Sequence, residues 1–425
     1  MQRSYDVVII GGGPAGSTAA TFLARKGHRV LIVEREKFPR FHIGESLLPH
    51  SMSAFERLGI LDKLEGRFLK KFGGEIVTSC GTRRVNFRFE KAFKKTSPYT
   101  FQVRRSEFDK ILLDNARANG ADLAEETTVQ GVSFNNSGAL LKLATNRGEC
   151  IQLRAAYVID ASGRHSVLGN HFKIKRPIVH LQKFSLYAHF TGLPQKCEED
   201  RQLIRLIRGA SAWYWYIPVS ETITSVGMVM NTKDFRCLKK SREAILEEFL
   251  AAEPATRELM GMNAKRVSEV YATGDYSYTM DQITGQRWML AGDAAGFIDP
   301  IFSTGVFLAV YSGEECASAI HVALENPARR AALFSRYERN IRRVMRKYQR
   351  FVNAWYSQEF IEVFTNPEGG PLDIVPAINS VLSGDLRQSF GVWWRLQVFY
   401  LVVFVQKFYP LVPRITLTPP VLKTT

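Results

Sequence analysis

A glycine-rich turn near the start of the chain, residues 11–16 with the sequence GGGPAG, constrains the fold more than any other feature. It follows a strand-like run at residues 6–10, apolar after Asp6, and leads into helical spacing at residues 15–26, after which residues 29–34 form a second such run with an apolar centre. This order of strand, turn, helix and strand predicts the βαβ unit of a parallel sheet. Glycines in the pattern G-x-G-x-x-G at its first turn are typical of dinucleotide-binding domains.

The glycines of this turn have separate physical roles. Gly11 permits the tight turn, Gly13 lets the backbone approach a pyrophosphate, and Gly16 lets the helix pack closely on the strand. The helix N-terminus then faces the negative charge, and Glu34, which ends the second strand, is placed to accept hydrogen bonds from ribose hydroxyls. The residues of this unit expected to contact a cofactor are Gly11, Gly13, Pro14, Ala15, Gly16 and Glu34.

The composition bounds the class of protein. The chain has 425 residues and is 45% hydrophobic, which is enough for two or three packed units. Its cysteines are scattered, odd in number and without a C-x-x-C pair: Cys80, Cys150, Cys197, Cys237 and Cys316. This pattern indicates a reducing cytoplasm, and it argues against a disulfide framework or a metal site of the zinc type.

No segment of the sequence predicts a membrane span or a signal peptide. The first four residues lead directly into a strand. The most apolar stretch, residues 396–405, is bounded by Arg395 and Lys407 and is too short to cross a bilayer. We expect it to form a buried helix, in preference to a helix that lies on a membrane surface.

The net charge of +16 favours acidic partners. Much of the excess lies at residues 328–350, where nine arginines and lysines face one acid, Glu338, while apolar residues recur at helical spacing. This is an amphipathic basic helix. Two interpretations remain open: a solvated face that keeps the protein soluble, or a docking face for an acidic protein. Nucleic acid is not expected as a partner, because no nucleic-acid-binding motif accompanies the charge.

Two later motifs follow apolar strands and identify the cofactor. They are DASGR at residues 160–164 and GDAAG at residues 292–296, and both resemble motifs of the hydroxylase-type FAD superfamily, which has the glutathione-reductase-like fold. That resemblance implies an α/β fold in which a Rossmann-type FAD-binding domain carries an inserted antiparallel substrate sheet and a helical C-terminal part. The expected division is residues 1–80, 102–178 and 284–330 for the FAD-binding domain, 81–101 and 179–283 for the substrate-binding sheet, and 331–425 for a helical region covering the active site.

The same resemblance implies further contacts to FAD. Asp293 would contact the ribityl or ribose region, whereas Asp160 would brace the loop near the pyrophosphate. Arg105 is the expected cofactor-facing arginine, with Arg104 as its competitor. The segment FPRFHIGESLLP at residues 38–49, shared with geranylgeranyl-reductase-like flavoproteins, implies contacts from Arg40 and Ser46, and Pro300 is implied as well. The chain has no second glycine fingerprint for a nicotinamide, so the reduced flavin is expected from a separate NAD(P)H-dependent flavin reductase.

A third group of motifs indicates a reaction. Residues 213–218 read WYWYIP and by themselves predict a buried strand that ends at Pro218. Residues 297–305 read FIDPIFSTG, matching F-x-x-P-x-x-S-x-G, and residues 68–74 read FLKKFGG, matching F-x-x-K-x-G. Together these segments resemble the flavin-dependent halogenases, over residues 1 to about 311. The resemblance also makes Trp213, Trp215, Pro218 and Phe297 signature residues rather than catalysts.

The resemblance implies a mechanism. A flavin hydroperoxide, formed from reduced FAD and molecular oxygen, oxidises chloride or bromide to hypohalous acid. Lys71 matches the family's catalytic lysine and would hydrogen-bond this acid or become a haloamine, while Lys70 lies one residue off the pattern. Ser303 is the catalytic serine of the motif, and the backbone amides of Thr304 and Gly305 would bind the halide, as a nest of N–H groups can. Residues 303–305 are equally suited to begin a helix, and both readings can hold.

Positions at which this chain departs from the family's pattern narrow the range of expected substrates. Tryptophan halogenases have Glu where this chain has Phe302, and relatives acting on phenols or pyrroles often have His where it has Phe307. The long C-terminal extension of many free-phenol halogenases is missing, and a compact aromatic tail is expected to cover the active-site mouth instead. This size, with the basic helix, resembles halogenases that act on a pyrrole thioester tethered to an acidic carrier protein.

We therefore predict an FADH2-dependent halogenase of a pyrrole or phenol ring, tethered to an acyl or peptidyl carrier protein. A flavin-dependent hydroxylase or a geranylgeranyl-reductase-like enzyme on the same scaffold is the first alternative, and it would act without halide. An inactive FAD-binding scaffold that docks partners through the basic helix is the second. The base that removes the ring proton is left unassigned by the sequence.

Overall fold

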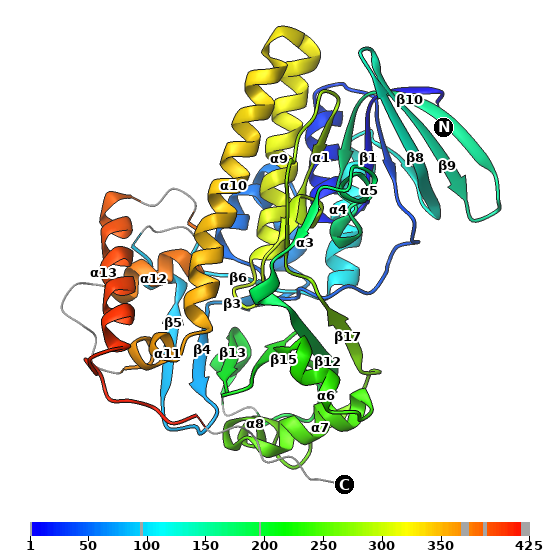
Figure 1. Ribbon diagram of the computed structural model, residues 1–425. Helices are drawn as coiled ribbons and strands as arrows, with labels where there is room; N and C mark the ends of the chain where they lie inside the picture. Colours follow the sequence, from blue (N-terminus) through cyan, green and yellow to red (C-terminus); the bar gives the residue numbers. More distant parts are fainter. Residues whose placement is uncertain (1, 94–96, 195–196, 367–373, 386–388, 418–425) are drawn as a thin grey trace.

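The fold places two sheets one above the other, with long helices along one side (Figure 1). The computed structural model describes residues 2–93, 97–194, 197–366, 374–385 and 389–417.

The N-terminal βαβ unit forms as predicted. Strands β1 (Ser4–Ile10) and β2 (Val30–Val33) are parallel neighbours joined by helix α1 (Pro14–Arg25). All four residues of β2 are buried, because both faces of this parallel sheet are covered. Helix α1 begins at Pro14, whose fixed φ suits the first helical position.

A seven-stranded sheet grows around this unit, in the order β7-β2-β1-β10-β9-β8, with β19 beside β10. Its central strand β10 (Cys150–Asp160) is long enough to pair with β9 (Gly138–Thr145) along its first half and with β19 (Trp288–Leu290) at its end. Strands β7 (Asp122–Ala124) and β8 (Thr127–Asn135) complete the sheet. The carboxyl ends of β1, β10 and β19 therefore meet at one edge, where ligands bind in sheets of this kind.

The second sheet has eight strands in the order β16-β12-β15-β14-β13-β4-β5, with β17 also pairing with β12. Every pair in it is antiparallel except β13 and β4, which run parallel and so depart from the expected antiparallel arrangement. Its strands are β4 (Gly73–Thr78), β5 (Arg84–Arg88), β12 (Lys183–Thr191), β13 (Leu203–Arg208), β14 (Ala212–Pro218), β15 (Thr224–Asn231), β16 (Lys265–Arg266) and β17 (Tyr271–Gly274).

Alternation along β14 gives this sheet two different faces. Tyr214 and Tyr216 join an apolar cluster with the helix α7 (Arg242–Ala252), which covers the outer face. Trp213 and Trp215 point the other way, into the main core and toward the first sheet. The period-two aromatic run predicted as a buried strand is therefore confirmed, and it presents its tryptophans to the space between the sheets.

One predicted strand joins a different sheet. Residues 81–101 were expected to belong to the antiparallel substrate sheet, but β6 (Thr100–Gln102) pairs instead with β3 (Leu69–Lys71) in a separate two-stranded ribbon. A small three-stranded sheet has the strand order β11-β18-β20. Its strands are β11 (Lys175–Pro177), β18 (Tyr278–Met280) and β20 (Gly296–Phe297).

Two long helices make up most of the helical part. Helix α9 (Thr304–Glu325) packs against α1 and against α10 (Arg330–Trp355), the expected basic helix. The amphipathic pattern of α10 is confirmed, because its buried residues recur at helical spacing from Phe334 to Trp355. Its one acid, Glu338, is paired with Arg342 at 2.7 Å.

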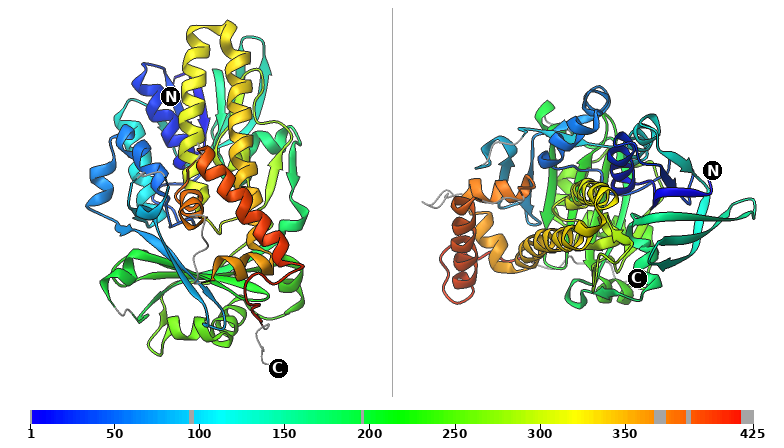
Figure 2. Two further views of the ribbon diagram at one scale, coloured as in Figure 1. Left: turned by 90° about the vertical axis from the view of Figure 1, so that its left-hand side faces the viewer. Right: turned by 90° about the horizontal axis from the view of Figure 1, so that it is seen from above.

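The C-terminal stretch corrects one expectation. Residues 396–405 lie in α13 (Phe390–Gln406), which buries only Val392, Leu396, Phe399 and Gln406, so it is not the buried helix that the sequence predicts. Helix α13 is the outermost element of the helical part and lies across the front of the left-hand view in Figure 2. Within the described residues, no helix combines the length and the apolar character needed to cross a bilayer.

The remaining short elements connect these parts. The α-helices are α2 (Met52–Leu58), α3 (Leu61–Glu65), α4 (Arg105–Ala118), α5 (Val167–His171), α6 (Thr232–Cys237), α8 (Pro254–Met260), α11 (Gln358–Phe364) and α12 (Ile374–Leu382). The 3-10 helices are η1 (Pro49–Ser51), η2 (Phe89–Lys91), η3 (Gly163–His165), η4 (Val179–Leu181), η5 (Glu198–Gln202), η6 (Gly292–Ala295) and η7 (Pro327–Arg329).

Candidate active site

A cavity of about 680 Å³ lies between the two sheets and gathers most of the residues singled out in the sequence. Those that line it are Gly11, Gly13, Pro14, Ala15, Glu34, Arg40, Ser46, Arg105, Trp213, Trp215, Asp293, Phe297, Pro300, Ser303 and Gly305. Those that do not are Gly16, Lys71, Asp160, Pro218 and Thr304. No described residue beyond Ala309 lines it, so the aromatic tail contributes nothing to its wall. In the described chain, the lining also contains no cysteine and no methionine.

The glycine turn is forced by close packing. Gly11 has a φ of +103°, and a Cβ there would lie 2.4 Å from the carbonyl oxygen of Ala161. A Cβ at Gly16 would lie 1.9 Å from the carbonyl oxygen of Gly11. Close packing therefore requires glycine at this position, although Gly16 does not line the cavity. The N-cap of α1 is Gly13, which has no side chain to cap the helix, so the N–H groups of the first turn remain available to an anion in the cavity.

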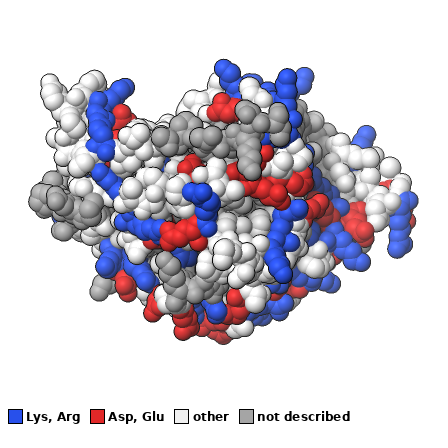
Figure 3. All heavy atoms as spheres, turned by 90° about the horizontal axis from the view of Figure 1, so that it is seen from below, with Lys and Arg blue, Asp and Glu red and all other residues white. Residues whose placement is uncertain are grey.

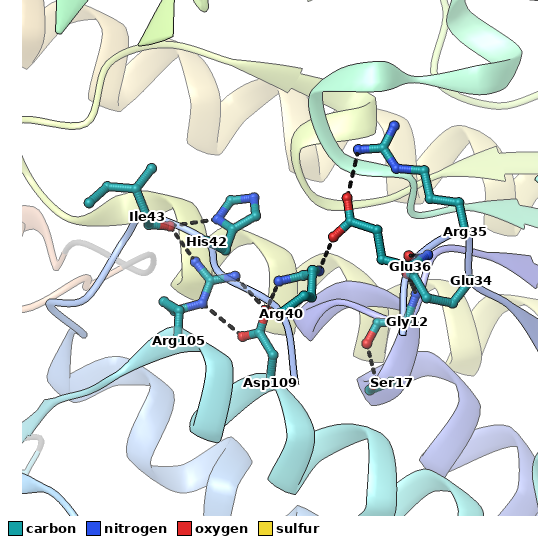
Figure 4. Close-up of polar contacts among 10 residues, drawn as sticks. All are labelled: Gly12, Ser17, Glu34, Arg35, Glu36, Arg40, His42, Ile43, Arg105 and Asp109. Carbon is teal, nitrogen blue, oxygen red and sulfur yellow. Dashed lines mark hydrogen bonds and ion pairs between the residues drawn. The ribbon is translucent and has the colours of Figure 1, made fainter. Parts of the chain in front are cut away.

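Glu34, Arg40 and Arg105 line the cavity near the start of α1 (Figure 4). Glu34 accepts a hydrogen bond of 2.7 Å from the backbone N–H of Gly12. Arg40 and Arg105 both bind the buried carboxylate of Asp109, at 2.9 Å and 2.7 Å. Arg105, rather than its neighbour Arg104, therefore reaches the cavity, and Asp109 holds both arginines in place.

The two aspartates of the later motifs differ in position. Asp160 is fully buried behind the wall, where it accepts hydrogen bonds from the backbone N–H groups of Ser162 at 3.0 Å and Leu168 at 2.6 Å. It braces its loop, as the sequence comparison implied, and does not line the cavity. Asp293 does line it, and burial raises the pKa of its carboxyl to about 6.

Lys71 lies behind the wall and reaches it through a serine. The Lys71 Nζ donates to the Ser46 Oγ at 2.7 Å and to the carbonyl oxygen of Leu47 at 3.1 Å, and the ring of Phe89 lies 5.1 Å away. Its side chain is only 1% exposed, and this burial lowers the pKa of the amine to about 7. Lys70, the neighbouring residue, faces outward and is 44% exposed.

Ser303 completes this chain of contacts. Its hydroxyl donates to the Ser46 Oγ at 3.0 Å, and Ser46 therefore joins Lys71 to the start of α9. Ser303 occupies the N-cap position of α9 with a φ of +56°, yet its side chain makes no capping hydrogen bond. The amides at this helix start, Thr304 and Gly305, are thus left to another acceptor, and Gly305 borders the cavity directly.

The two tryptophans form the opposite wall. Their ring centroids lie 5.8 Å apart, and the ring of Trp215 occupies space that a Cβ at Gly227 would enter at 2.3 Å. The indole of Trp213 donates to the Tyr356 hydroxyl at 3.0 Å, which in turn donates to the Asp299 Oδ2 at 2.8 Å. The C-terminal helices therefore support this wall from behind.

Sequence reasoning missed a hydrogen-bonded pair formed by Glu45 of the cavity wall and His189 behind it. The carboxylate of Glu45 lies 2.7 Å from the imidazole Nε2 of His189, and it is 2% exposed. Its second oxygen, Oε2, is buried without a hydrogen bond to any described residue. Glu45 lies beside Ser46 in the segment GES, so its position next to a serine that was expected to contact the cofactor was the available signal. His189 lies on β12 and carries no sequence motif.

Comparison with known proteins gives a consistent result. The family described as an FAD binding domain matches residues 4–352. A 1H-pyrrole-2-carbonyl-(peptidyl-carrier protein) chlorinase of Pseudomonas fluorescens is 31% identical over 412 residues, covering 91% of this chain and 90% of that protein. A solved flavoprotein/dehydrogenase from Cytophaga hutchinsonii has a TM-score of 0.85 at 28% identity and covers 95% of this chain and 99% of its own. The solved flavin-dependent halogenase CmlS has a TM-score of 0.78 at 30% identity, with coverages of 94% and 70%.

Proposed function

Because this chain belongs to the FAD-binding-domain family and, within it, to the flavin-dependent halogenases, we propose that it chlorinates or brominates a pyrrole or phenol ring tethered to an acyl or peptidyl carrier protein. The observation that carries this proposal is the hydrogen-bonded chain of Lys71, Ser46 and Ser303, which links a buried amine to the cavity wall and to the start of α9. A hydroxylase on the same scaffold has no use for such an amine.

FAD is the cofactor, and the residues of the cavity fit it. The uncapped N-terminus of α1 suits the pyrophosphate, and Glu34 suits the ribose hydroxyls. Arg40 and Arg105 add positive charge, and Asp293 and Pro300 lie along the remaining wall. When bound in its reduced form, FAD supplies, with molecular oxygen, the oxidation of halide to hypohalous acid. A separate NAD(P)H-dependent flavin reductase provides the electrons, since the chain has one dinucleotide fingerprint.

The halide binds at the start of α9. The backbone N–H groups of Thr304 and Gly305 receive no capping bond from Ser303, and a helix N-terminus favours a negative charge. Ser303 turns its hydroxyl toward Ser46 instead, which leaves both amides without a cap, and Gly305 borders the cavity.

Lys71 captures the oxidised halogen. An amine with a pKa of about 7 is partly unprotonated at neutral pH, so its lone pair can attack the halogen of hypohalous acid. The nitrogen–halogen bond forms as the oxygen–halogen bond breaks, and water leaves. The ring then takes the halogen from nitrogen while the nitrogen takes up a proton, so Lys71 is regenerated as the amine and the proton that the ring loses balances the step.

Glu45 accepts the proton that the ring loses. Its Oε2 accepts no hydrogen bond from any residue that the structure describes, and the paired His189 holds the other oxygen in place. Glu45 and Ser46 are adjacent in sequence, so the proposed base and the serine that contacts Lys71 are neighbours in the cavity wall.

The carrier protein approaches along α10. The exposed arginines of this helix form a basic face, and carrier proteins of the expected kind are acidic. The pyrrole-specific relative from Pseudomonas fluorescens spans nearly the whole chain, which supports a carrier-bound pyrrole over a free substrate.

Mass spectrometry of reconstituted reactions tests this function. The protein is incubated with FAD, a flavin reductase, NADH, oxygen and chloride or bromide, and pyrrolyl-loaded carrier protein and free phenols are offered in parallel. A halogen isotope pattern on the carrier-bound ring is expected, lost in Lys71→Ala and retained in the matched Lys70→Ala. Halogenation of free phenol alone would discard the carrier, and oxygenated product without halogen would discard the halogenase.

A further inference from the structure

Helix α13 is apolar on two opposite faces. One face packs against α11 and α12. The other face points outward and carries a row of large apolar side chains, each between 50% and 77% exposed: Phe390, Trp393, Leu401, Phe404 and, just beyond the helix, Phe408. We call this row the α13 stripe.

The α13 stripe follows the helical repeat. At 3.6 residues per turn its five positions fall within an arc of about 80°, with Gln397 as the one polar residue among them. Tyr409 and Leu411, which follow, are 72% and 55% exposed. A helix face that water covers is normally polar, so this row indicates another environment.

Basic residues border the α13 stripe. Arg350 of α10 donates to the Gln397 side chain at 2.7 Å and lies 3.8 Å from the ring of Tyr400. Arg343 and Arg346 are exposed on the same face of α10, about two turns and one turn before Arg350, respectively. Lys407 and Arg414 border the other end, where the acid that contacts Arg414, Glu362, is itself buried. The underside of the molecule differs, since lysines and arginines there are mixed with aspartates and glutamates (Figure 3).

We propose that α13 lies flat in the surface of a membrane that contains anionic lipids, with the α13 stripe among the acyl chains and the bordering arginines and lysine at the headgroups. Aromatic and aliphatic residues on one helix face, with cations at its edges, are the composition of interfacial helices. The shape agrees, because α13 is a convex outermost helix of about 25 Å, and a bilayer surface accepts such a helix along its whole length (Figure 1, Figure 2). This inference is independent of the halogenation chemistry, and it leaves Arg336 and Arg339, in the first half of α10, exposed to the carrier protein.

Vesicle sedimentation of the full chain tests the proposal. We expect binding to vesicles of phosphatidylcholine with about a quarter phosphatidylglycerol, weaker binding to phosphatidylcholine alone, and a loss of binding as salt is raised. The double variant Leu401→Glu/Phe404→Glu is expected to reduce binding by at least about tenfold. The matched control is Met262→Glu, which adds a charge at a fully exposed apolar residue remote from α13 and should bind as the wild type does.

A second readout keeps the test independent of folding. Trp393 is half exposed in the α13 stripe, so anionic vesicles should shift its emission to shorter wavelength, and Trp393→Phe should remove that shift. Absent or salt-insensitive binding, or equal binding to neutral vesicles, overturns the proposal. It is also overturned if the double variant binds vesicles normally, or if the variant only converts a dimer to a monomer, because the α13 stripe would then be covered by a second copy.

Discussion

The Lys71 Nζ lies 2.7 Å from the Ser46 Oγ, and that hydroxyl, rather than the amine, is what the cavity exposes. The amine therefore meets the cavity through a single serine. Ser46 also accepts from Ser303, so one small side chain connects the buried amine, the cavity and the start of α9.

Ser46→Ala should separate the chemistry from cofactor binding. The substitution removes the shorter of two hydrogen bonds to a buried amine, and a lost partner of a charged donor costs about 1–3 kcal/mol. We expect turnover to fall about tenfold to a hundredfold, measured as halogenated product per unit time. Affinity for reduced FAD, measured by fluorescence, should change much less. An equal loss of both quantities would make Ser46 a cofactor ligand only.

The pH dependence of turnover should follow the Lys71 amine. Burial lowers its pKa to about 7, and a nitrogen–halogen bond requires the unprotonated form. Turnover at saturating substrate should therefore rise as pH increases through about 7, and then level off. Single-turnover halogenation across this range measures it. If turnover instead fell through the same range, Lys71 would act as an ammonium hydrogen-bond donor and not as a haloamine.

The free energy of unfolding should also depend on pH through Lys71, and the direction of this dependence follows from the pKa of the amine. The Lys71 pKa is lowered from 10.5 to about 7 in the folded state, so the unfolded chain binds more protons between these values. Stability therefore rises with pH across this window, and below it the full cost of burying the ammonium remains. Lys71→Met lacks this cost and should be more stable by a few kcal/mol at pH about 6, with a smaller gain at pH about 9.

Urea unfolding at both pH values measures this difference. Lys70→Met is the matched control, because Lys70 is 44% exposed and loses little contact with water on folding. A gain for Lys71→Met that did not depend on pH would mean that packing, and not charge, is responsible.

Glu45→Gln should slow the final proton transfer. The amide keeps the shape of the side chain and its contact with His189, but it accepts a proton poorly. We expect turnover to fall about a hundredfold, and a substrate deuterated at the reacting carbon should show a primary kinetic isotope effect that the wild type lacks. Glu90→Gln, on the exposed surface, is the control. Unchanged turnover would leave the base unassigned.

The local part of the site is readable from the sequence because its physics is local. The glycine turn needs a positive φ at Gly11 and the absence of a Cβ at Gly16, and only glycine supplies either. The alternation of residues 213–216 likewise determines which side chains share a face of β14. Such constraints act between neighbours and therefore leave a visible pattern in the chain.

The rest of the site depends on contacts between distant segments. Glu45 and His189 are 144 residues apart, and Trp213 meets Tyr356 across 143, so no spacing in the sequence joins them. The prediction of a buried helix at residues 396–405 was wrong for a different reason. An apolar run predicts burial, but it does not distinguish a helix buried on every side from one whose second apolar face is exposed.

The composition of the cavity wall has a consequence for the lifetime of the enzyme. Thiols and thioethers are the side chains that oxidants convert to sulfenic acids and sulfoxides, and the described lining of the cavity contains neither a cysteine nor a methionine. A reagent as corrosive as bleach, made in that space, meets hydroxyls, carboxylates and aromatic rings before it meets sulfur. The wall thereby omits the sulfur side chains that the enzyme's own oxidising intermediate would destroy first.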